Sequence, residues 1–376
     1  MAQSWQSVLE RWRDAGLIDT ATAERIHAYE QANGEPAQFS WPVRIAIGFG
    51  ALMLGAGVLL FIAVHWDQLS PGARFTLVLI LVAMFHVAGA FASSRFPELA
   101  MALHGIGTIA AGAGIYLSAQ IFNLQEHWPG GIMLWAVAAW IAWWILRDWV
   151  QAGLAAMLTP AWLAAEWIDI AEHHHASGKW AMEGLLLLAL TYLSACYGAH
   201  RSPVRRVLMW IGGITVLPLA TICATDLIWG ERGRIPLGAY LIGVPVAILG
   251  PMMLGWILRG KEIWQLAACA VWTTLASWLP TYPFHGGLLP RLTPYLWTAA
   301  GSIGLIAWGL SEDRAERINL GIVGFGLTIL VFYFSSVMDK MDRSASLIGL
   351  GLLFLLLGWF LEKLRRRLVA RVEGAA

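Results

Sequence analysis

Residues 73–92 read ARFTLVLILVAMFHVAGAFA, a run of twenty residues whose ionisable side chains are Arg74 and His86. A helix of this length spans roughly 30 Å, which is the thickness of the hydrocarbon core of a bilayer. It also satisfies its own backbone hydrogen bonds where no water can do so. The stretch therefore predicts a membrane-spanning helix.

The same pattern recurs along the whole chain. Eleven further apolar stretches are joined by short polar segments, at 43–64, 99–122, 129–146, 149–168, 180–198, 204–229, 236–257, 262–280, 293–310, 317–335 and 344–362. The composition agrees, because 58% of the residues are hydrophobic and 13% are charged, whereas soluble domains carry about 25% charged residues. We therefore predict an all-α, polytopic integral membrane protein with about 12 transmembrane helices in residues 41–364.

The positions of Lys and Arg indicate an orientation in the membrane. Cytoplasmic loops of membrane proteins are enriched in these residues, and with the N-terminus inside, 18 of the 25 Lys and Arg residues fall on the inner side. We expect both termini to be cytoplasmic and a basic cytoplasmic tail at 365–376. The basic segment EKLRRRLVAR (362–371) suits anionic lipid, whereas a net charge of +1 argues against nucleic acid as a partner.

Residues 1–40 precede the first apolar stretch and are predicted to form a small cytoplasmic helical hairpin. Apolar side chains recur at helical spacing at Trp5, Leu9 and Trp12. Gly16 interrupts this pattern, and a second helix is expected from Asp19 to the Asn33-Gly34 pair. This hairpin packs on itself, on the membrane domain, or on a protein partner, and the sequence leaves these alternatives open.

An internal repeat links the first two pairs of apolar stretches. The small residues Gly48, Gly50, Gly55, Ala56 and Gly57 recur at Gly105, Gly107, Gly112, Ala113 and Gly114. The spacing predicts a duplicated two-helix unit, at 43–92 and 99–146. Small residues allow close approach of neighbouring helices, so a packing seam is the first interpretation, and a substrate channel lined by glycine carbonyls is the alternative.

Several segments resemble a known bacterial family. LERWRDAGLID (9–19), GVLLFIAVHWDQLSPGARF (57–75), GAGIYLSAQIFNLQEHWPGGIMLWA (112–136) and the segment 318–367 resemble predicted membrane proteins classified as domain of unknown function 2157. The resemblance implies a multi-pass protein of the bacterial inner membrane. It brings no established activity, substrate or catalytic residue.

Ionisable residues deep in a membrane are costly and often functional. His86 and His104 are the deepest such residues, at similar depth on consecutive antiparallel helices, and they could meet across the hairpin. They are candidates for a proton relay, with neutral structural histidines as the alternative. No Lys, Arg, Asp or Glu lies near the middle of a predicted span, which argues against a buried carboxylate relay.

The predicted outer face is rich in acids, amides and tryptophans. We identify Gln120, Asn123, Glu166, Asp226 and Asp67 as candidate ligand-binding residues for a polar or cationic small molecule. If the protein is a carrier, four of them should line one cavity open to the outside: Gln120, Asn123, Glu166 and Asp226. An ordinary belt of interfacial residues is the alternative.

Metal, cofactor and enzyme signatures are weak. Asp169, Glu172 and His173 have the spacing of one helix face and could hold a divalent ion, but a solvated loop is the simpler interpretation, so no metal site and no cofactor are predicted. The three cysteines fall inside predicted spans. Zincin, phosphate-loop and nucleophile-elbow motifs are missing from the sequence, so we do not expect an enzyme.

Two main functions remain, of which we favour the first, and an enzyme acting on a lipid or glycan at the outer face is a third alternative. A carrier or ligand-binding membrane protein with a polar site at the outer face is favoured by the number of spans, the duplication and the helices interrupted at Pro160, Pro218, Pro245 and Pro251. A non-transporting scaffold or sensor that signals through the N-terminal hairpin is the alternative. The scaffold or sensor is supported in turn, because no charged residue that could couple transport to an ion lies near the middle of a predicted span.

Overall fold

The computed structural model of the protein describes residues 5–33, 69–121, 127–198, 202–224, 233–279 and 288–337, with single residues or short pieces in 46–53 and 348–363. In this part of the chain the regular secondary structure is entirely helical. The chain divides into two compact units, residues 1–74 and 75–376.

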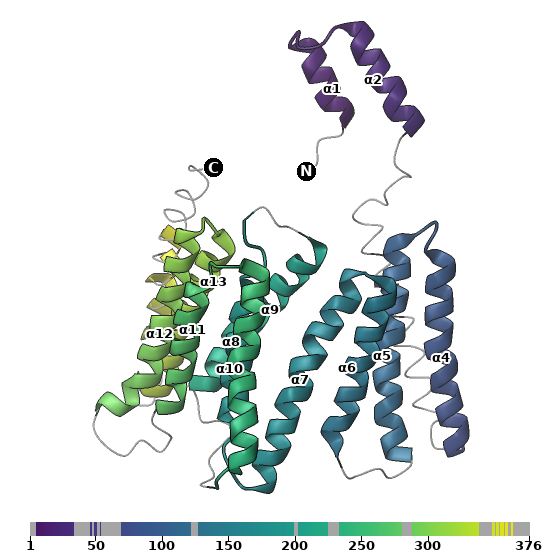
Figure 1. Cartoon of the computed structure of the whole chain (residues 1–376). Helices are drawn as coiled ribbons and strands as arrows, with labels where there is room; N and C mark the ends of the chain where they lie inside the picture. Colours follow the sequence, from purple (N-terminus) through teal and green to yellow (C-terminus); the bar gives the residue numbers. More distant parts are fainter. Residues whose placement is uncertain are drawn as a thin grey trace. The chain divides into compact units, whose positions relative to one another are not determined.

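Within the N-terminal unit the structure describes the helices α1 (Trp5–Asp14) and α2 (Thr20–Asn33), which pack on each other (Figure 1). Gly16 lies between them with φ of +68°, a conformation that residues with a Cβ rarely adopt. The Asp19 carboxylate then accepts a hydrogen bond from the Thr22 backbone N–H at 3.0 Å and caps the start of α2. Two helices are thus present in this segment, and a separate cytoplasmic hairpin stays a prediction.

The larger unit is a bundle of helices (Figure 1). Its elements are α4 (Pro71–Ala92), α5 (Pro97–Ile121), α6 (Trp128–Leu146), α7 (Trp149–His173), α8 (Lys179–Leu193), α9 (Pro203–Ala224), α10 (Leu237–Arg259), α11 (Trp264–Thr274) with the 3-10 turn η2 (Leu275–Trp278), α12 (Leu288–Ser311), α13 (Ala315–Phe332) and the π-turn η3 (Tyr333–Val337). Among these, α6 with α7, α8 with α9 and α12 with α13 are closely packed pairs.

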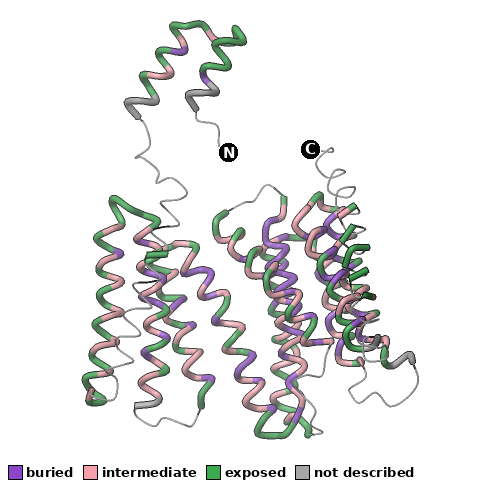
Figure 2. The backbone as a smooth tube through the Cα atoms, turned by 180° about the vertical axis from the view of Figure 1, so that it is seen from behind, coloured by how far each residue is buried: buried purple, intermediate pink, exposed green. Residues whose placement is uncertain are grey.

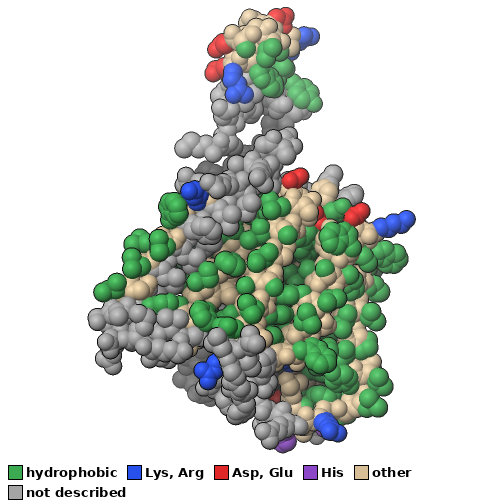
Figure 3. Space-filling view, turned by 90° about the vertical axis from the view of Figure 1, so that its left-hand side faces the viewer, with side chains coloured by type: hydrophobic (Ala, Val, Ile, Leu, Met, Phe, Trp, Pro, Cys, Tyr) green, Lys and Arg blue, Asp and Glu red, His purple; other side chains and the backbone are tan. Residues whose placement is uncertain are grey.

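Seven of the described helices are long and apolar enough to cross a membrane: α4, α5, α6, α7, α9, α10 and α13. Their outward surfaces carry large apolar side chains, such as Leu79, Trp144 and Ile214, and Lys, Arg, Asp and Glu gather near the ends of the bundle (Figure 3). The predicted spans 43–64 and 344–362 lie largely outside the described residues. The expected total of about twelve spans therefore stays a prediction.

Helix α8 is shorter than the predicted span 180–198. It has 15 residues, of which ten are buried, because α7, α9, α10 and α11 surround it. By contrast, α4 lies at the edge of the bundle, and of its residues only Gly89 is buried. Figure 2 shows this difference between central and peripheral helices. A helix enclosed by protein is apolar all round, as is a helix that crosses lipid, so apolar composition alone could not separate these two cases, and a membrane crossing by residues 180–198 stays a prediction.

The second copy of the glycine pattern is a packing seam in the structure. A Cβ added at Gly112 would lie 2.2 Å from the indole of Trp135 on α6, and one added at Gly114 would lie 2.6 Å from Val78 on α4. Such distances leave no room for a side chain, as expected where helices approach closely. Most of the first copy lies outside the described residues, so the duplication itself stays a prediction.

Candidate functional site

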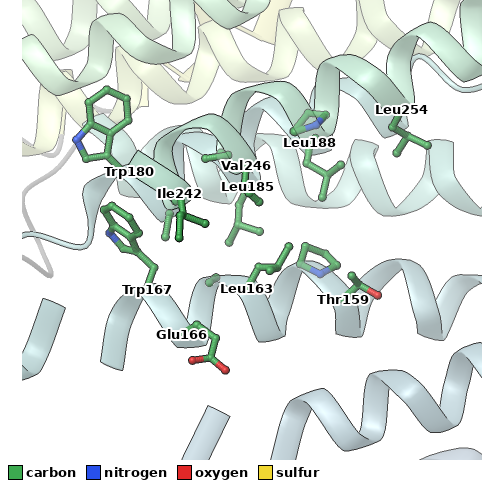
Figure 4. A pocket seen from close by; sticks show the side chains of 18 of the residues that line it. Thr159, Leu163, Glu166, Trp167, Trp180, Leu185, Leu188, Ile242, Val246 and Leu254 are labelled. Carbon is green, nitrogen blue, oxygen red and sulfur yellow. The ribbon is translucent and has the colours of Figure 1, made fainter. Parts of the chain in front are cut away.

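A groove of about 480 Å³ lies between α7 on one side and α8 with α10 on the other (Figure 4). Its lining is mostly apolar and includes Leu163 of α7, Leu185 and Leu188 of α8, and Ile242, Val246 and Leu254 of α10. This volume lies within the range of about 300–1,000 Å³ that is usual for small-molecule sites. The groove is therefore large enough for a ligand and suited to an apolar one.

Proline and glycine residues shape the groove. Pro160 lies inside α7 and has no N–H, so the Ala156 carbonyl lacks its helical partner. The Tyr192 hydroxyl of α8 donates a hydrogen bond to that carbonyl at 2.8 Å. On the other side, a Cβ at Gly184 of α8 would lie 2.7 Å from the Ala247 side chain. Gly184 thus permits the close contact of α8 with α10.

We expect replacement of Tyr192 by Phe to lower the free energy of unfolding by about 1 kcal/mol, because the half-buried Ala156 carbonyl would lose its hydrogen-bond partner. In a Pro160→Ala background the same change should cost about 1 kcal/mol less, since the backbone N–H restored at position 160 can bond to that carbonyl. Unfolding of the four variants in detergent measures this coupling. Equal costs in both backgrounds would show that Pro160 does not determine the role of Tyr192.

One end of the groove is aromatic and acidic. Tyr240 contacts both Trp167 and Trp180, with ring centroids 6.1 and 5.8 Å apart. Glu166 lines the groove at this end, and its carboxylate is directed away from α8 and α10 (Figure 4). That carboxylate accepts a hydrogen bond from the indole N–H of Trp162 at 2.7 Å.

His127, which precedes α6, lies between the carboxylates of Glu166 and Asp169. Its Nε2 lies 3.0 Å from Glu166 Oε2, and its Nδ1 lies 3.9 Å from Asp169 Oδ2. Asp169 is one turn further along α7, and its carboxylate is also 3.7 Å from His173 Nδ1. Two carboxylates and two imidazoles therefore form an acidic cluster beside the aromatic end of the groove.

Of the predicted ligand-binding residues, the structure places Glu166 at the groove. Asn123, Asp226 and Asp67 lie outside the described residues, and Gln120 lies in α5 where its side chain is not described. Their convergence on one cavity stays a prediction. The groove differs from the expected polar cavity in that most of its lining is apolar.

Two of the three metal candidates, Asp169 and His173, are engaged in other contacts. His173 Nδ1 lies 2.8 Å from the backbone carbonyl of Asp169, at hydrogen-bonding distance, and Glu172 is exposed. Within the described ranges, no group of three or more His, Cys, Asp or Glu residues has a geometry that could hold a metal ion.

His86 and His104 meet across the α4–α5 hairpin. Their Nδ1 atoms lie 3.0 Å apart, at hydrogen-bonding distance, so one ring donates and the other accepts. Each imidazole lies against a glycine of the opposite helix, His86 against Gly107 and His104 against Gly89. The meeting expected from their matched depth is confirmed, and a proton-relay role stays a prediction.

The sequence did not identify three buried polar groups. They are Glu183 with Ser277, Gln151 with Thr108, and the cluster of Glu312 with Arg259 and Arg317. Glu183 and the two arginines lie near the ends of predicted spans, where a solvated position at the membrane boundary is the usual interpretation. Their burial depends on helices that are distant in sequence, and no local pattern signals it.

Apolar helices of membrane-spanning length and charges near their ends define a polytopic helical membrane protein. Residues 10–152 match the family of predicted membrane proteins DUF2157, which confirms the resemblance over that part of the chain. The match extends from α1 to the first residues of α7. No curated protein and no solved structure matches the chain.

Proposed function

We propose that this protein is a membrane-embedded ligand-binding protein of the carrier type, and that its ligand is a cationic amphiphile with a long apolar chain. The groove is the observation that carries the proposal. Its apolar lining comes from α7 and α10, which are long and apolar enough to cross a bilayer, and from the enclosed α8. An apolar chain there would contact the apolar side chains of these three helices.

The acidic end of the groove favours a cationic headgroup. Glu166 lines this end, and Asp169 lies beside it across His127; a cation at this end can replace His127 as the partner of Glu166. The rings of Trp167, Trp180 and Tyr240 lie at the same end, and aromatic faces attract cations. Dodecylamine has both chemical features and is a suitable probe.

A photoreactive diazirine derivative of dodecylamine tests the proposal on the purified full-length protein. We expect saturable labelling of peptides from α7, α8 and α10 that excess dodecylamine prevents. Gly250 lines the groove, and a Cβ there would meet no atom within 4 Å. The Gly250→Trp variant should therefore fold, fill the groove and weaken binding at least about tenfold, which corresponds to about 1.4 kcal/mol.

Gly304 provides the matched control. It lies inside α12, away from the groove, and a Cβ there also meets no atom within 4 Å. Gly304→Trp should leave labelling of the groove unchanged. Labelling spread evenly over the outward faces of the bundle, unaffected by excess dodecylamine or by Gly250→Trp, would contradict the proposal and favour the scaffold or sensor alternative.

A further inference from the structure

Glu183 is a buried carboxyl group on the opposite side of α8 from the groove. The residue is 2% exposed. Its Oε1 accepts a hydrogen bond from the Ser277 hydroxyl of η2 at 2.6 Å, and its buried Oε2 has no hydrogen-bond partner among the described residues. Because an ionised carboxylate has about four acceptor positions, one hydrogen bond leaves most of its capacity unused.

Among the described residues, none forms an ion pair with Glu183. Lys179, one turn earlier on α8, and Cys223 of α9 are the described titratable groups that interact with it electrostatically. No ion pair to Glu183 is formed within the described part of the chain, and η2 contributes the Ser277 hydroxyl. An unpaired buried carboxylate costs several kcal/mol, and a carboxyl group in such a place is neutralised instead.

The species that neutralises Glu183 must fit the available space. Oε2 is enclosed by protein, so a hydrated cation would have to displace the helices around it. A proton adds no volume and converts the carboxylate into a neutral acid that still accepts the Ser277 hydrogen bond through its carbonyl oxygen.

We propose that Glu183 is a proton-binding site, and that proton binding there is linked through α8 to ligand binding in the groove. The linkage rests on the proposed function. Successive residues of a helix are rotated by about 100°, which places Ala181, Leu185 and Leu188 roughly opposite Glu183. These three residues line the groove.

One short helix therefore separates the two sites. Loss of the proton leaves an unpaired charge on the buried face of α8, and movement of α8 away from η2 to admit water would relieve that cost. The same movement displaces the residues that line the groove. By linkage, a ligand that requires the present position of α8 favours the protonated form, and the protonated form binds the ligand more tightly.

Infrared spectroscopy tests the proton directly, without any ligand. At neutral pH the wild-type protein should show a carbonyl stretching band of a protonated carboxylic acid that is missing in Glu183→Gln. This replacement preserves the volume of the side chain and can keep the Ser277 hydrogen bond. Glu172→Gln, which changes an exposed acid, should retain the band. Identical bands in wild type and Glu183→Gln would show that Glu183 is ionised and overturn the proposal.

A second variant, Ser277→Ala, keeps the proposal testable if Glu183→Gln does not fold. Ser277→Ala removes the hydrogen-bond donor to Glu183 and should shift the band to higher frequency without abolishing it. An unshifted band in folded Ser277→Ala would mean that the protonated acid is not Glu183, which also overturns the proposal.

The linkage is tested by measuring dodecylamine binding, through competition with the photoreactive derivative, at neutral and at alkaline pH. Binding by wild type should weaken about tenfold more than binding by Glu183→Gln, a factor typical of coupled sites. Equal weakening in both proteins would disprove the linkage while leaving the proton site intact. Failure of the proposed function is distinguishable, since then the labelling would not be saturable in wild type at any pH.

Discussion

Replacement of Glu312 by Gln is expected to lower the free energy of unfolding by about 3–5 kcal/mol, because it removes the negative member of a buried charge cluster. The side chains of Arg259 and Arg317 are 0% and 1% exposed. Glu312 pairs with both of them and also accepts a hydrogen bond from the Trp308 indole at 2.6 Å. The variant would remove the ion-pair partner that the two buried guanidinium groups share. Unfolding in detergent, followed by tryptophan fluorescence, measures the loss.

Two controls separate charge from packing. Glu316 lies 3.7 Å from Arg314 and its side chain is 39% exposed, so Glu316→Gln should change stability by no more than about 0.5 kcal/mol. A triple variant, Arg259→Met with Glu312→Leu and Arg317→Met, removes all three charges and should recover most of the loss. If the triple variant were as unstable as Glu312→Gln, unpaired charge would not be the cause.

The same cluster predicts a pH dependence. Burial alone raises the pKa of Glu312, but the hydrogen bond from Arg259 and the nearby charge of Arg317 outweigh it and hold the pKa below its usual value. A carboxyl group with a lowered pKa in the folded state stabilises the protein above its unfolded-state pKa. The contribution of Glu312 is therefore complete at neutral pH and is lost in acid as Glu312 becomes protonated.

The sequence predicted the positions of the long helices well. The expected span 129–146 matches α6 (Trp128–Leu146), and 73–92 matches α4 (Pro71–Ala92). Both helices expose much of their apolar surface, so their composition reports the lipid around them directly. The meeting of His86 with His104 was also predictable, since the two residues lie at similar depth on helices joined by a short turn.

The candidate site was predictable only in part. Glu166 was identified at the boundary of a span, and it lies at one end of the groove. The groove itself combines α7 and α8 with α10, and the contact of Gly184 with Ala247 joins residues that are far apart in sequence. An apolar pattern reports that a residue avoids water, not whether lipid, protein or a ligand surrounds it. The same limit concealed Glu183 and the short length of α8.

At Gly212 the contact of α8 with α9 leaves no room for a side chain. A Cβ at this position would lie 2.4 Å from the Ala189 carbonyl oxygen and 2.4 Å from the Leu193 backbone nitrogen. These are backbone atoms of a helix, so a rotamer change cannot relieve the overlap. Gly212→Leu should separate the two helices and lower the free energy of unfolding by about 3 kcal/mol, the upper end of the usual cost of overpacking.

The adjacent Gly213 is expected to respond in the opposite direction. Its nearest neighbour would be the Leu193 side chain at 3.8 Å, an ordinary contact. Gly213→Leu should therefore raise the free energy of unfolding by about 0.5–1 kcal/mol, because glycine is a poor helix former. Thermal unfolding of both variants in detergent provides the comparison. Equal losses at both positions would show that any bulk in this part of α9 is harmful, and that the close approach at Gly212 is not the reason for a glycine there.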